Sequence, residues 1–298
     1  MKQIADSELI LNPDGSIYHL NLLPEDIAPT VIVVGDPSRV PKVSKHFDNI
    51  DKRKQKREFL THTGTIGKHR FTVLSTGIGT DNIDIVLNEL DALVNVDLQD
   101  KTIKDELTSL NIIRIGTSGG LQDFVELDGF VASSHGLGLD GLINYYEFPY
   151  DDEERRMISG FNQLIDFDEL GIKPYVVRGS NDLLAHFDEG FYRGITATCN
   201  GFYGPQGRMI RAQPKFPNLI DQLQNFDDNG TKVTNFEMET GGIYGLTRLL
   251  GHRGLSLNAV VADRIHQEYS KAPQRTIEQL IKTVLERLTA SDSFVPNS

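Results

Sequence analysis

Cysteine is nearly absent from this chain: Cys199 is the only one among 298 residues. A disulfide within the chain is therefore excluded, and we expect a reducing, cytoplasmic location. Basic residues are also few, since 30 lysines and arginines face 42 acidic residues and leave a formal net charge of -12. Nucleic acids and anionic membranes favour basic partners, so we expect neither to bind.

Long apolar runs and several cofactor motifs are missing as well. No segment reaches the ~18 apolar residues of a membrane-spanning helix, and residues 1–6 do not begin a signal peptide. The histidines fall in no His-Glu-x-x-His pattern and no Cys-x-x-Cys occurs, so we expect no metal site. Gly77-x-Gly79 lacks the third glycine of a dinucleotide fingerprint, because Asn82 takes that place, and there is no Walker loop. We therefore expect no cofactor.

The stretch Asn111–Gly120 carries an arginine inside an apolar run. Its β-branched residues predict a buried parallel strand that ends in a small-residue turn from Gly116 to Gly120. Arg114 within the strand needs a partner, because burying an unpaired guanidinium costs several kcal/mol. The N–H groups and hydroxyls of the turn would form an oxyanion cradle with Arg114. The alternative is an internal pair between Arg114 and a carboxylate.

Strand, glycine turn and helix recur along the chain, at Gly35, Gly77 and Gly116. This order predicts an α/β sheet whose ligand sites collect at the carboxyl ends of the strands. We expect the more polar segment 141–194 to be a peripheral insertion. The apolar patterns predict strands over 30–34, 71–75, 194–198 and 259–262, and helices over 83–93, 235–250 and 277–288.

Six short motifs resemble, in the same order, those of the nucleoside phosphorylase superfamily and within it the uridine phosphorylases. The resemblance covers nearly the whole chain. It implies a single domain over residues 1–298, an α/β three-layer sandwich with a mixed, barrel-like central sheet flanked by helices, working as a dimer or a ring of dimers. The motifs are Gly35-Asp36-Pro37-Ser38-Arg39-Val40, Arg57-Glu58-Phe59, Ser75-Thr76-Gly77-Ile78-Gly79, Arg114-Ile115-Gly116-Thr117-Ser118-Gly119, Phe202-Tyr203-x-x-Gln206-x-Arg208 and Glu237-Met238-Glu239.

The resemblance implies a phosphate site, with inorganic phosphate as a co-substrate. Gly35, Arg39, Arg114 and Thr117 would bind the anion, and Arg57 would reach in from a neighbouring subunit. The residue chemistry agrees, because forked guanidinium donors and glycine N–H groups suit a phosphate dianion. Composition alone would make the basic run that holds Arg57 a solvated face.

The resemblance also implies sites for a ribose and a pyrimidine base. Met238 and Glu239 would hold the ribose, with the 2′ and 3′ hydroxyls donating to the carboxylate, and the partner subunit would contribute His19 at the 5′ end. By composition alone, Met238 is more simply core filling. The base would meet three residues of one loop, by stacking on Phe202 and by hydrogen bonds to Gln206 and Arg208. The catalytic residues would be Arg39, Arg114, Arg208 and Glu239.

Asp263 and Arg264 mark a departure from the family pattern at the base-binding end. Arg264 fits the uridine branch, but that branch carries asparagine where Asp263 stands, and the purine branch places a catalytic aspartate there. Asp263 could therefore serve a purine enzyme. Some relatives hold a monovalent cation near the positions of Glu58 and Asn82, but this chain has asparagine in place of the family's serine, so we do not include a cation.

The leading hypothesis is phosphorolysis of uridine to uracil and ribose 1-phosphate. The alternatives are a purine nucleoside phosphorylase using Asp263, a hydrolase using water, and, from a different class, a non-catalytic nucleoside-binding protein. A binder or a hydrolase has no need for the complete set of phosphate arginines. Cleavage of uridine with and without phosphate, with inosine as competitor, separates the four hypotheses.

Overall fold

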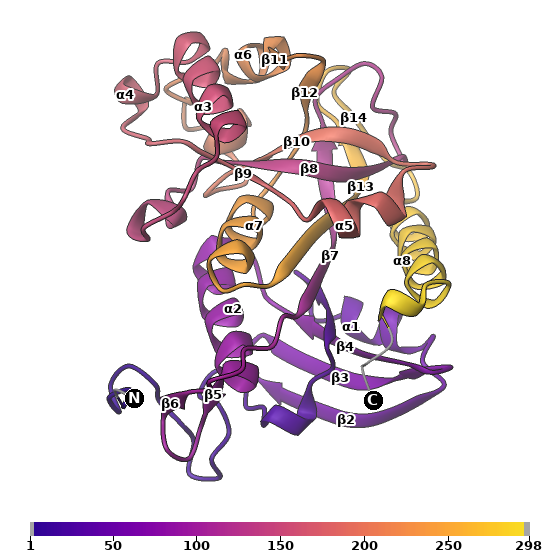
Figure 1. The fold of residues 1–298 in the computed structure, drawn as a ribbon. Helices are drawn as coiled ribbons and strands as arrows, with labels where there is room; N and C mark the ends of the chain where they lie inside the picture. The colour runs from indigo at the N-terminus through magenta and orange to yellow at the C-terminus, as the bar shows by residue number, and fades with distance from the viewer. Residues whose placement is uncertain (1–2, 295–298) are drawn as a thin grey trace.

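The computed structural model describes residues 3–294, and within them twelve strands form one mixed sheet. A separate pair, β5 (Val96–Asp97) and β6 (Thr102–Ile103), lies near the N-terminal segment (Figure 1). The strands of the main sheet are β1 (Thr30–Val34), β2 (Asn49–Lys56), β3 (Phe59–Ile66), β4 (His69–Ser75), β7 (Asn111–Gly120), β8 (Phe130–Gly138), β9 (Tyr175–Arg178), β10 (Tyr192–Thr198), β11 (Asp227–Asp228), β12 (Thr231–Glu237), β13 (Arg253–Asp263) and β14 (Glu268–Tyr269).

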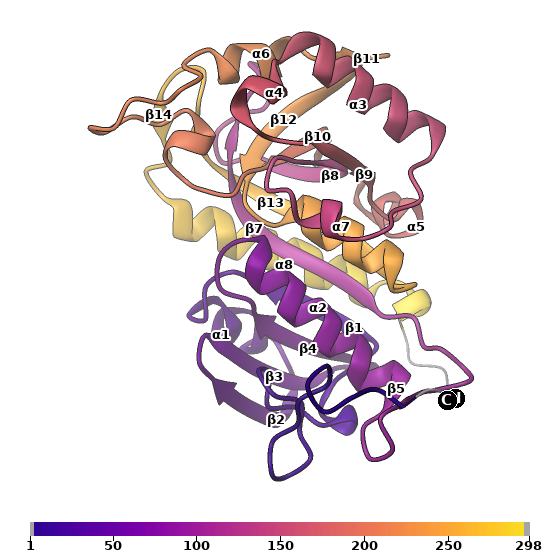
Figure 2. The same cartoon turned by 90° about the vertical axis from the view of Figure 1, so that its left-hand side faces the viewer.

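Part of the sheet closes on itself. Strand β7 pairs with β13, and β13, β8, β10 and β12 follow in order. The ring closes because Asn235 and Phe236 of β12 pair with Gly120 and Gly119 at the end of β7. On its other side, β7 continues through β1, β4, β3 and β2, so it joins the closed part to an open part, as Figures 1 and 2 show. The predicted mixed, barrel-like sheet is confirmed.

Helices cover both faces of the sheet, which gives the predicted three layers. Alternate residues of β1 point to opposite faces. Val31 and Val33 join the core on the side of α2 (Thr80–Asn95) and α7 (Thr240–Leu249), whereas Ile32 and Val34 join the core on the side of α1 (Arg39–Ser44) and α8 (Pro273–Thr289). The helices are α1 (Arg39–Ser44), α2 (Thr80–Asn95), α3 (Asp152–Leu164), α4 (Phe167–Leu170), α5 (Asn181–Leu184), α6 (Leu219–Asn225), α7 (Thr240–Leu249) and α8 (Pro273–Thr289).

The turn predicted from Gly116 to Gly120 is wrong. Strand β7 continues to Gly120 and pairs with β13 along its whole length. Glycine is needed at 116 for a different reason: a Cβ there would overlap the guanidinium of Arg114, two residues earlier on the same face of the strand. The glycine makes room for a side chain rather than for a turn.

The predicted start of the helix near Asn235 is also wrong. Residues up to Glu237 belong to β12, and α7 begins at Thr240. The buried residues at 233–237 pair with β10 in parallel and with β7 in antiparallel orientation. Tertiary pairing decides the structure here, because the local pattern suits either a buried strand or a buried helix.

Most other predicted elements are confirmed, including the strands over 30–34 and 71–75 and the amphipathic helices α2 and α8. The segment 141–194 carries α3, α4 and α5, and also β9, which pairs with β8 and whose Tyr175 is fully buried. Of the helices in residues 3–294, none combines the length and apolar character needed to cross a lipid bilayer.

Candidate active site

A cavity of about 1390 Å³ opens where the strands of the sheet end. It lies at the carboxyl ends of β1, β4, β12 and β13 and against β7, which is where α/β sheets bind their ligands. All the predicted site residues line it except His19 and Arg57. Those that do are Gly35, Arg39, Arg114, Thr117, Phe202, Gln206, Arg208, Met238, Glu239, Asp263 and Arg264.

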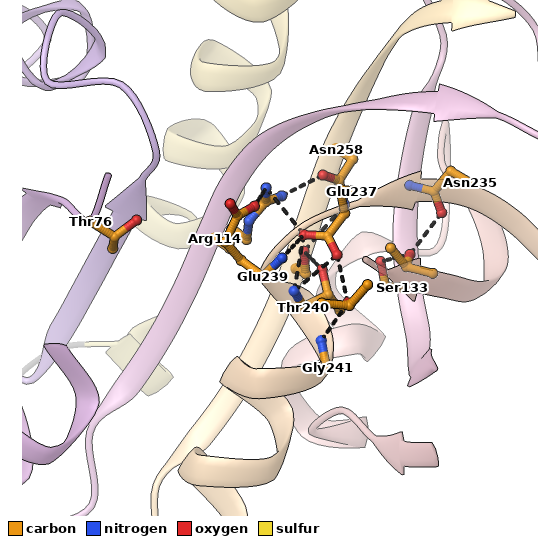
Figure 3. Close-up of polar contacts among 12 residues, drawn as sticks. Thr76, Arg114, Ser133, Asn235, Glu237, Glu239, Thr240, Gly241 and Asn258 are labelled. Atoms are coloured by element: carbon orange, nitrogen blue, oxygen red, sulfur yellow. Dashed lines mark hydrogen bonds and ion pairs between the residues drawn. The ribbon is translucent and has the colours of Figure 1, made fainter. Parts of the chain in front are cut away.

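Arg114 is buried, with only 5 % of its surface exposed, and protein groups satisfy it. Its Nη1 donates to Asn258 Oδ1 at 2.5 Å, and its Nη2 donates to Glu239 Oε2 and lies 3.1 Å from Glu237 Oε2 (Figure 3). Burial alone would lower the pKa of Arg114, but the charges of Glu237 and Glu239 outweigh burial and raise it. The structure therefore contains the internal ion pair that was the alternative prediction for Arg114. The same arginine also lines the cavity.

Glu237 is a buried carboxylate that the residue-by-residue prediction missed. It ends β12, accepts from Thr198 Oγ1 at 2.7 Å, and accepts from the N–H groups of Glu239 and Thr240, both at 2.9 Å, at the start of α7. Burial raises its pKa, and the Arg114 charge opposes that rise. The sequence contained a signal for Glu237, because it stands two residues from Glu239 in one motif, and a buried arginine elsewhere in the chain needed a carboxylate partner.

Asn258 was missed as well. It is fully buried in β13, and its only sequence signal is a polar side chain inside the apolar run 255–261. Its register opposite Gly116 brings its amide to Arg114. Asn258 therefore holds Nη1 of the guanidinium, while the two glutamates hold Nη2.

A second arginine enters the same part of the cavity. Arg39 begins α1, directly after the Gly35 loop, and its Nη1 donates to the carbonyl of Ile115 at 3.2 Å. Burial first, and then the nearby charge of Arg114, lowers the pKa of Arg39. Arg114 is buried and Arg39 is partly buried, and two like charges held close together favour an anion between them. Gly35 and Thr117 line this wall and can supply an N–H group and a hydroxyl.

The loop 202–208 forms another part of the cavity wall. Arg208 Nη1 donates to Gln206 Oε1 at 2.6 Å and to the carbonyl of Phe202 at 2.7 Å, while its guanidinium lies 3.8 Å from the Phe202 ring centroid. Burial and the charge of Arg264 lower the pKa of Arg208 to about 10. Because Oε1 of Gln206 faces Arg208, its NH₂ group is left to donate elsewhere.

Asp263 lines the cavity but is held by its own turn. It accepts from the N–H groups of Ile265 and His266 at 2.8 and 2.9 Å and from the His266 ring at 2.8 Å. Burial favours the neutral acid, but these hydrogen bonds outweigh burial, and the pKa of Asp263 is below its ordinary value. Asp263 is therefore a carboxylate at neutral pH.

The structure does not bring Arg57 or His19 into this cavity. Arg57 is exposed in the two-residue turn between β2 and β3, with a positive φ of 52°, while the next residue, Glu58, lines the cavity. His19 lies on the N-terminal segment, against Glu89 of α2. Glu58 Oε1 accepts from Asn82 Nδ2 at 3.2 Å, so the two residues set aside as cation ligands bond to each other.

Comparison with known proteins places this geometry in a family. The family model described as the phosphorylase superfamily matches residues 29–290. A uridine phosphorylase of Thermococcus kodakarensis is 29% identical over 282 residues, which cover 92% of this chain and 87% of that one. A DeoD-type purine nucleoside phosphorylase of Buchnera aphidicola is 24% identical over 274 residues, 91% of this chain and 98% of that one.

The fold agrees with the sequence comparison. The crystal structure of a Trypanosoma brucei nucleoside phosphorylase, described as showing uridine phosphorylase activity, superposes with a TM-score of 0.82. It is 28% identical and covers 95% of this chain and 100% of its own. The family match spans nearly all of the sheet and every strand end that lines the cavity. The chain belongs to the phosphorylase superfamily.

Proposed function

We propose that this protein catalyses the phosphorolysis of uridine to uracil and α-D-ribose 1-phosphate. The observation that carries the proposal is the composition of one cavity. It holds the buried Arg114 and the partly buried Arg39, the Met238–Glu239 pair, whose glutamate contacts Arg114, and the Gln206–Arg208 pair. These groups match an anion, a sugar diol and a pyrimidine, and the contact between Arg114 and Glu239 sets the anion beside the diol.

At the phosphate end, Arg39 and Arg114 would bind the oxyanion, with Thr117 and the Gly35 backbone completing its shell. Glu239 would accept hydrogen bonds from the ribose 2′ and 3′ hydroxyls. One of its oxygens already accepts from the N–H of Gly79 at 2.8 Å and the other from Arg114. A carboxylate has about four lone-pair positions, so two remain for a diol. Met238 would pack against the sugar.

At the base end, Gln206 has an orientation that suits uracil. Its Oε1, held by Arg208, keeps a lone pair for the imide N3–H, and its NH₂ can donate to a carbonyl of the base. Arg208 and Arg264 would face the oxygen on which negative charge develops. Phe202, half exposed and stacked on Arg208, would cover one face of the ring.

In the reaction, a phosphate oxygen attacks C1′ as the glycosidic bond breaks, and the bonding electrons leave with the uracil ring. Phosphate gains the bond to C1′, and the uracil anion takes a proton from water. The protein aligns the two substrates and stabilises the charge that moves onto uracil. Removing one such donor costs on the order of 10² to 10³ in rate.

Asp263 favours uridine over a purine nucleoside. A purine phosphorylase would need an acid at this position to donate a proton to the base. The hydrogen bonds from His266 and Ile265 keep Asp263 ionised, and an ionised carboxylate only accepts. Asp263 is therefore suited to organise its turn rather than to protonate a base.

We further propose that two subunits share each active site. The charges of Arg39 and Arg114 (+2) cancel those of Glu237 and Glu239 (-2), so these four side chains together carry no net positive charge to offset the phosphate dianion. A third cation is needed, and Arg57 of a partner would supply it. The segments of Arg57 and His19 touch, because Lys56 Nζ donates to the carbonyl of Tyr18 at 2.5 Å. One partner surface could therefore deliver both residues.

Cleavage of uridine in phosphate and in phosphate-free buffer tests the reaction, with inosine in a parallel assay. We expect uracil release that requires phosphate and a clear preference for uridine. Equal release without phosphate would indicate a hydrolase, preferred cleavage of inosine would indicate a purine enzyme, and binding without cleavage would indicate a nucleoside-binding protein.

Subunit mixing tests the shared site. Inactive Arg57→Ala and Glu239→Ala chains are combined under conditions that exchange subunits. A mixed dimer would contain one site with Arg57 from one chain and Glu239 from the other, and we expect activity to return. Continued inactivity after demonstrated exchange, or a fully active monomer, would contradict sharing.

A further inference from the structure

Glu89, in the middle of α2, holds the segment that carries His19. Its Oε1 lies 2.6 Å from His19 Nδ1, and its two oxygens accept from the N–H of His19 at 3.0 Å. Oε2 also accepts from the N–H of Leu20 at 2.8 Å. The Glu89 side chain is largely buried, and it does not line the cavity of its own chain.

These contacts fix the hydrogen on the His19 ring. A carboxylate only accepts, so Nδ1 must carry a hydrogen, and in the neutral ring Nε2 is then an acceptor. The Tyr18 ring meets the imidazole edge-on, with centroids 4.7 Å apart, and limits its rotation. Within residues 3–294, Nε2 of His19 makes no hydrogen bond, and the side chain is 27 % exposed.

We propose that Glu89 is a positioning residue. It holds the His19 imidazole so that Nε2 accepts a hydrogen bond from the 5′-hydroxyl of the nucleoside bound in the partner's cavity. The inference rests on the proposed function, in which His19 acts across the subunit interface. Its basis is the pairing of a largely buried carboxylate with Nδ1 of a partly exposed imidazole whose Nε2 makes no hydrogen bond within residues 3–294.

Holding the His19 segment in place does not by itself explain why Glu89 contacts the imidazole ring. Lys56 already ties the same segment, through the carbonyl of Tyr18 and through Asn12 Oδ1 at 2.8 Å. Glu89 adds backbone contacts and also the short contact to the imidazole. Lys56 can therefore only hold the segment, whereas Glu89 can both hold the segment and orient the ring, because of the two residues only Glu89 contacts the imidazole.

Steady-state kinetics with uridine and 5′-deoxyuridine test the inference, because the second substrate lacks the hydroxyl in question. The measured quantity is the ratio of the two kcat/KM values. In Glu89→Gln we expect this ratio to fall by about three- to tenfold, the worth of one hydrogen bond. His19→Ala should show the same fall, and the double variant no further fall. Lys56→Met should leave the ratio unchanged, because a loosened segment affects both substrates alike.

Several results would overturn the proposal. Equal losses for both substrates in Glu89→Gln would indicate a structural role alone, and an unchanged ratio in His19→Ala would remove the hydrogen bond that Glu89 is said to position. Long-range ¹H–¹⁵N NMR of the ring gives a readout independent of activity, and a neutral His19 protonated on Nε2 in the wild type would also refute it. A wild type that cleaves no uridine would defeat the proposed function itself, whereas normal cleavage with an unchanged ratio in Glu89→Gln defeats only this inference.

Discussion

Replacing Arg208 with methionine tests the base end of the cavity most directly. The substitution keeps much of the aliphatic stem and removes the guanidinium that donates to Gln206 and to the carbonyl of Phe202. Two consequences follow. Uracil loses a cation facing its developing charge, and the Gln206 amide loses the contact that fixes its orientation, so it can rotate and present the wrong group to the base.

The expected magnitude follows from these two losses. Removing one preorganised donor to a developing anion costs about 10² to 10³ in kcat, or roughly 2.7 to 4 kcal/mol. The wrongly oriented Gln206 amide would add to this loss, so kcat/KM for uridine should fall by at least about 10². Phosphate binding should change little, because the hydrogen bonds that hold Arg39 and Arg114 do not involve Arg208. The assay is initial-rate release of uracil with each substrate varied in turn.

Arg211→Met is the matched control. Arg211 is exposed, lies three residues farther along the same loop and does not line the cavity, so its loss should leave kcat/KM near the wild-type value. The reasoning is refuted if Arg208→Met loses less than about tenfold, or if the KM for phosphate rises in parallel with that for uridine.

Three further predictions concern the supports of the site. Asn258→Leu removes the acceptor of Arg114 Nη1 and should lower the free energy of unfolding by about 2 kcal/mol in urea titration, the worth of a hydrogen bond to a charged group. Gly116→Ala places a Cβ against the Arg114 guanidinium and should cost about 3 kcal/mol, whereas Gly204→Ala, where the Cβ meets open space, should cost under about 1 kcal/mol. Asp263→Asn should keep uridine activity within about threefold. Because the pKa of Asp263 is lowered, Asp263 loses its charge only below its ordinary range near pH 4, so no loss of wild-type activity between about pH 5 and 8 should trace to it. A large loss of activity in Asp263→Asn, or a gain of wild-type cleavage as the pH falls toward the range in which Asp263 is protonated, would contradict this role.

The Arg114 stretch shows how far a local pattern reaches. The apolar run predicted a buried strand, and the charge within it predicted a buried partner; both are confirmed. The identity of the partners lies beyond local reasoning, because Glu239 is 125 residues away and Asn258 is 144. Only the resemblance assigned a role to Glu239, and the weak signals of Glu237 and Asn258, a carboxylate in the same motif and a polar residue in an apolar run, were not used.

The two wrong elements have one physical cause. Gly116 and Asn235 were assigned from local signals, glycine for a turn and an apolar run for a helix. Their actual structures follow from contacts across the sheet, with Arg114 in one case and with β7 and β10 in the other. The roles of Arg57 and His19 stay predictions for a related reason. Neither residue lines the cavity of its own chain, and on the proposed sharing of sites the surface that would use them is that of a second copy.

On the proposed function, the pair formed by Arg114 and Glu239 links the two substrates. In the structure the arginine donates to the carboxylate that would bind the ribose diol, and the same guanidinium faces the place of the phosphate. A phosphate that draws Arg114 toward itself weakens the ion pair and leaves Glu239 more of its lone pairs and charge for the 2′ and 3′ hydroxyls. Glu237 and Asn258 keep the arginine from leaving altogether, because each holds it independently of Glu239. The buried pair therefore stabilises the empty site and also couples occupation of its two halves, with a coupling free energy that acts equally in both directions.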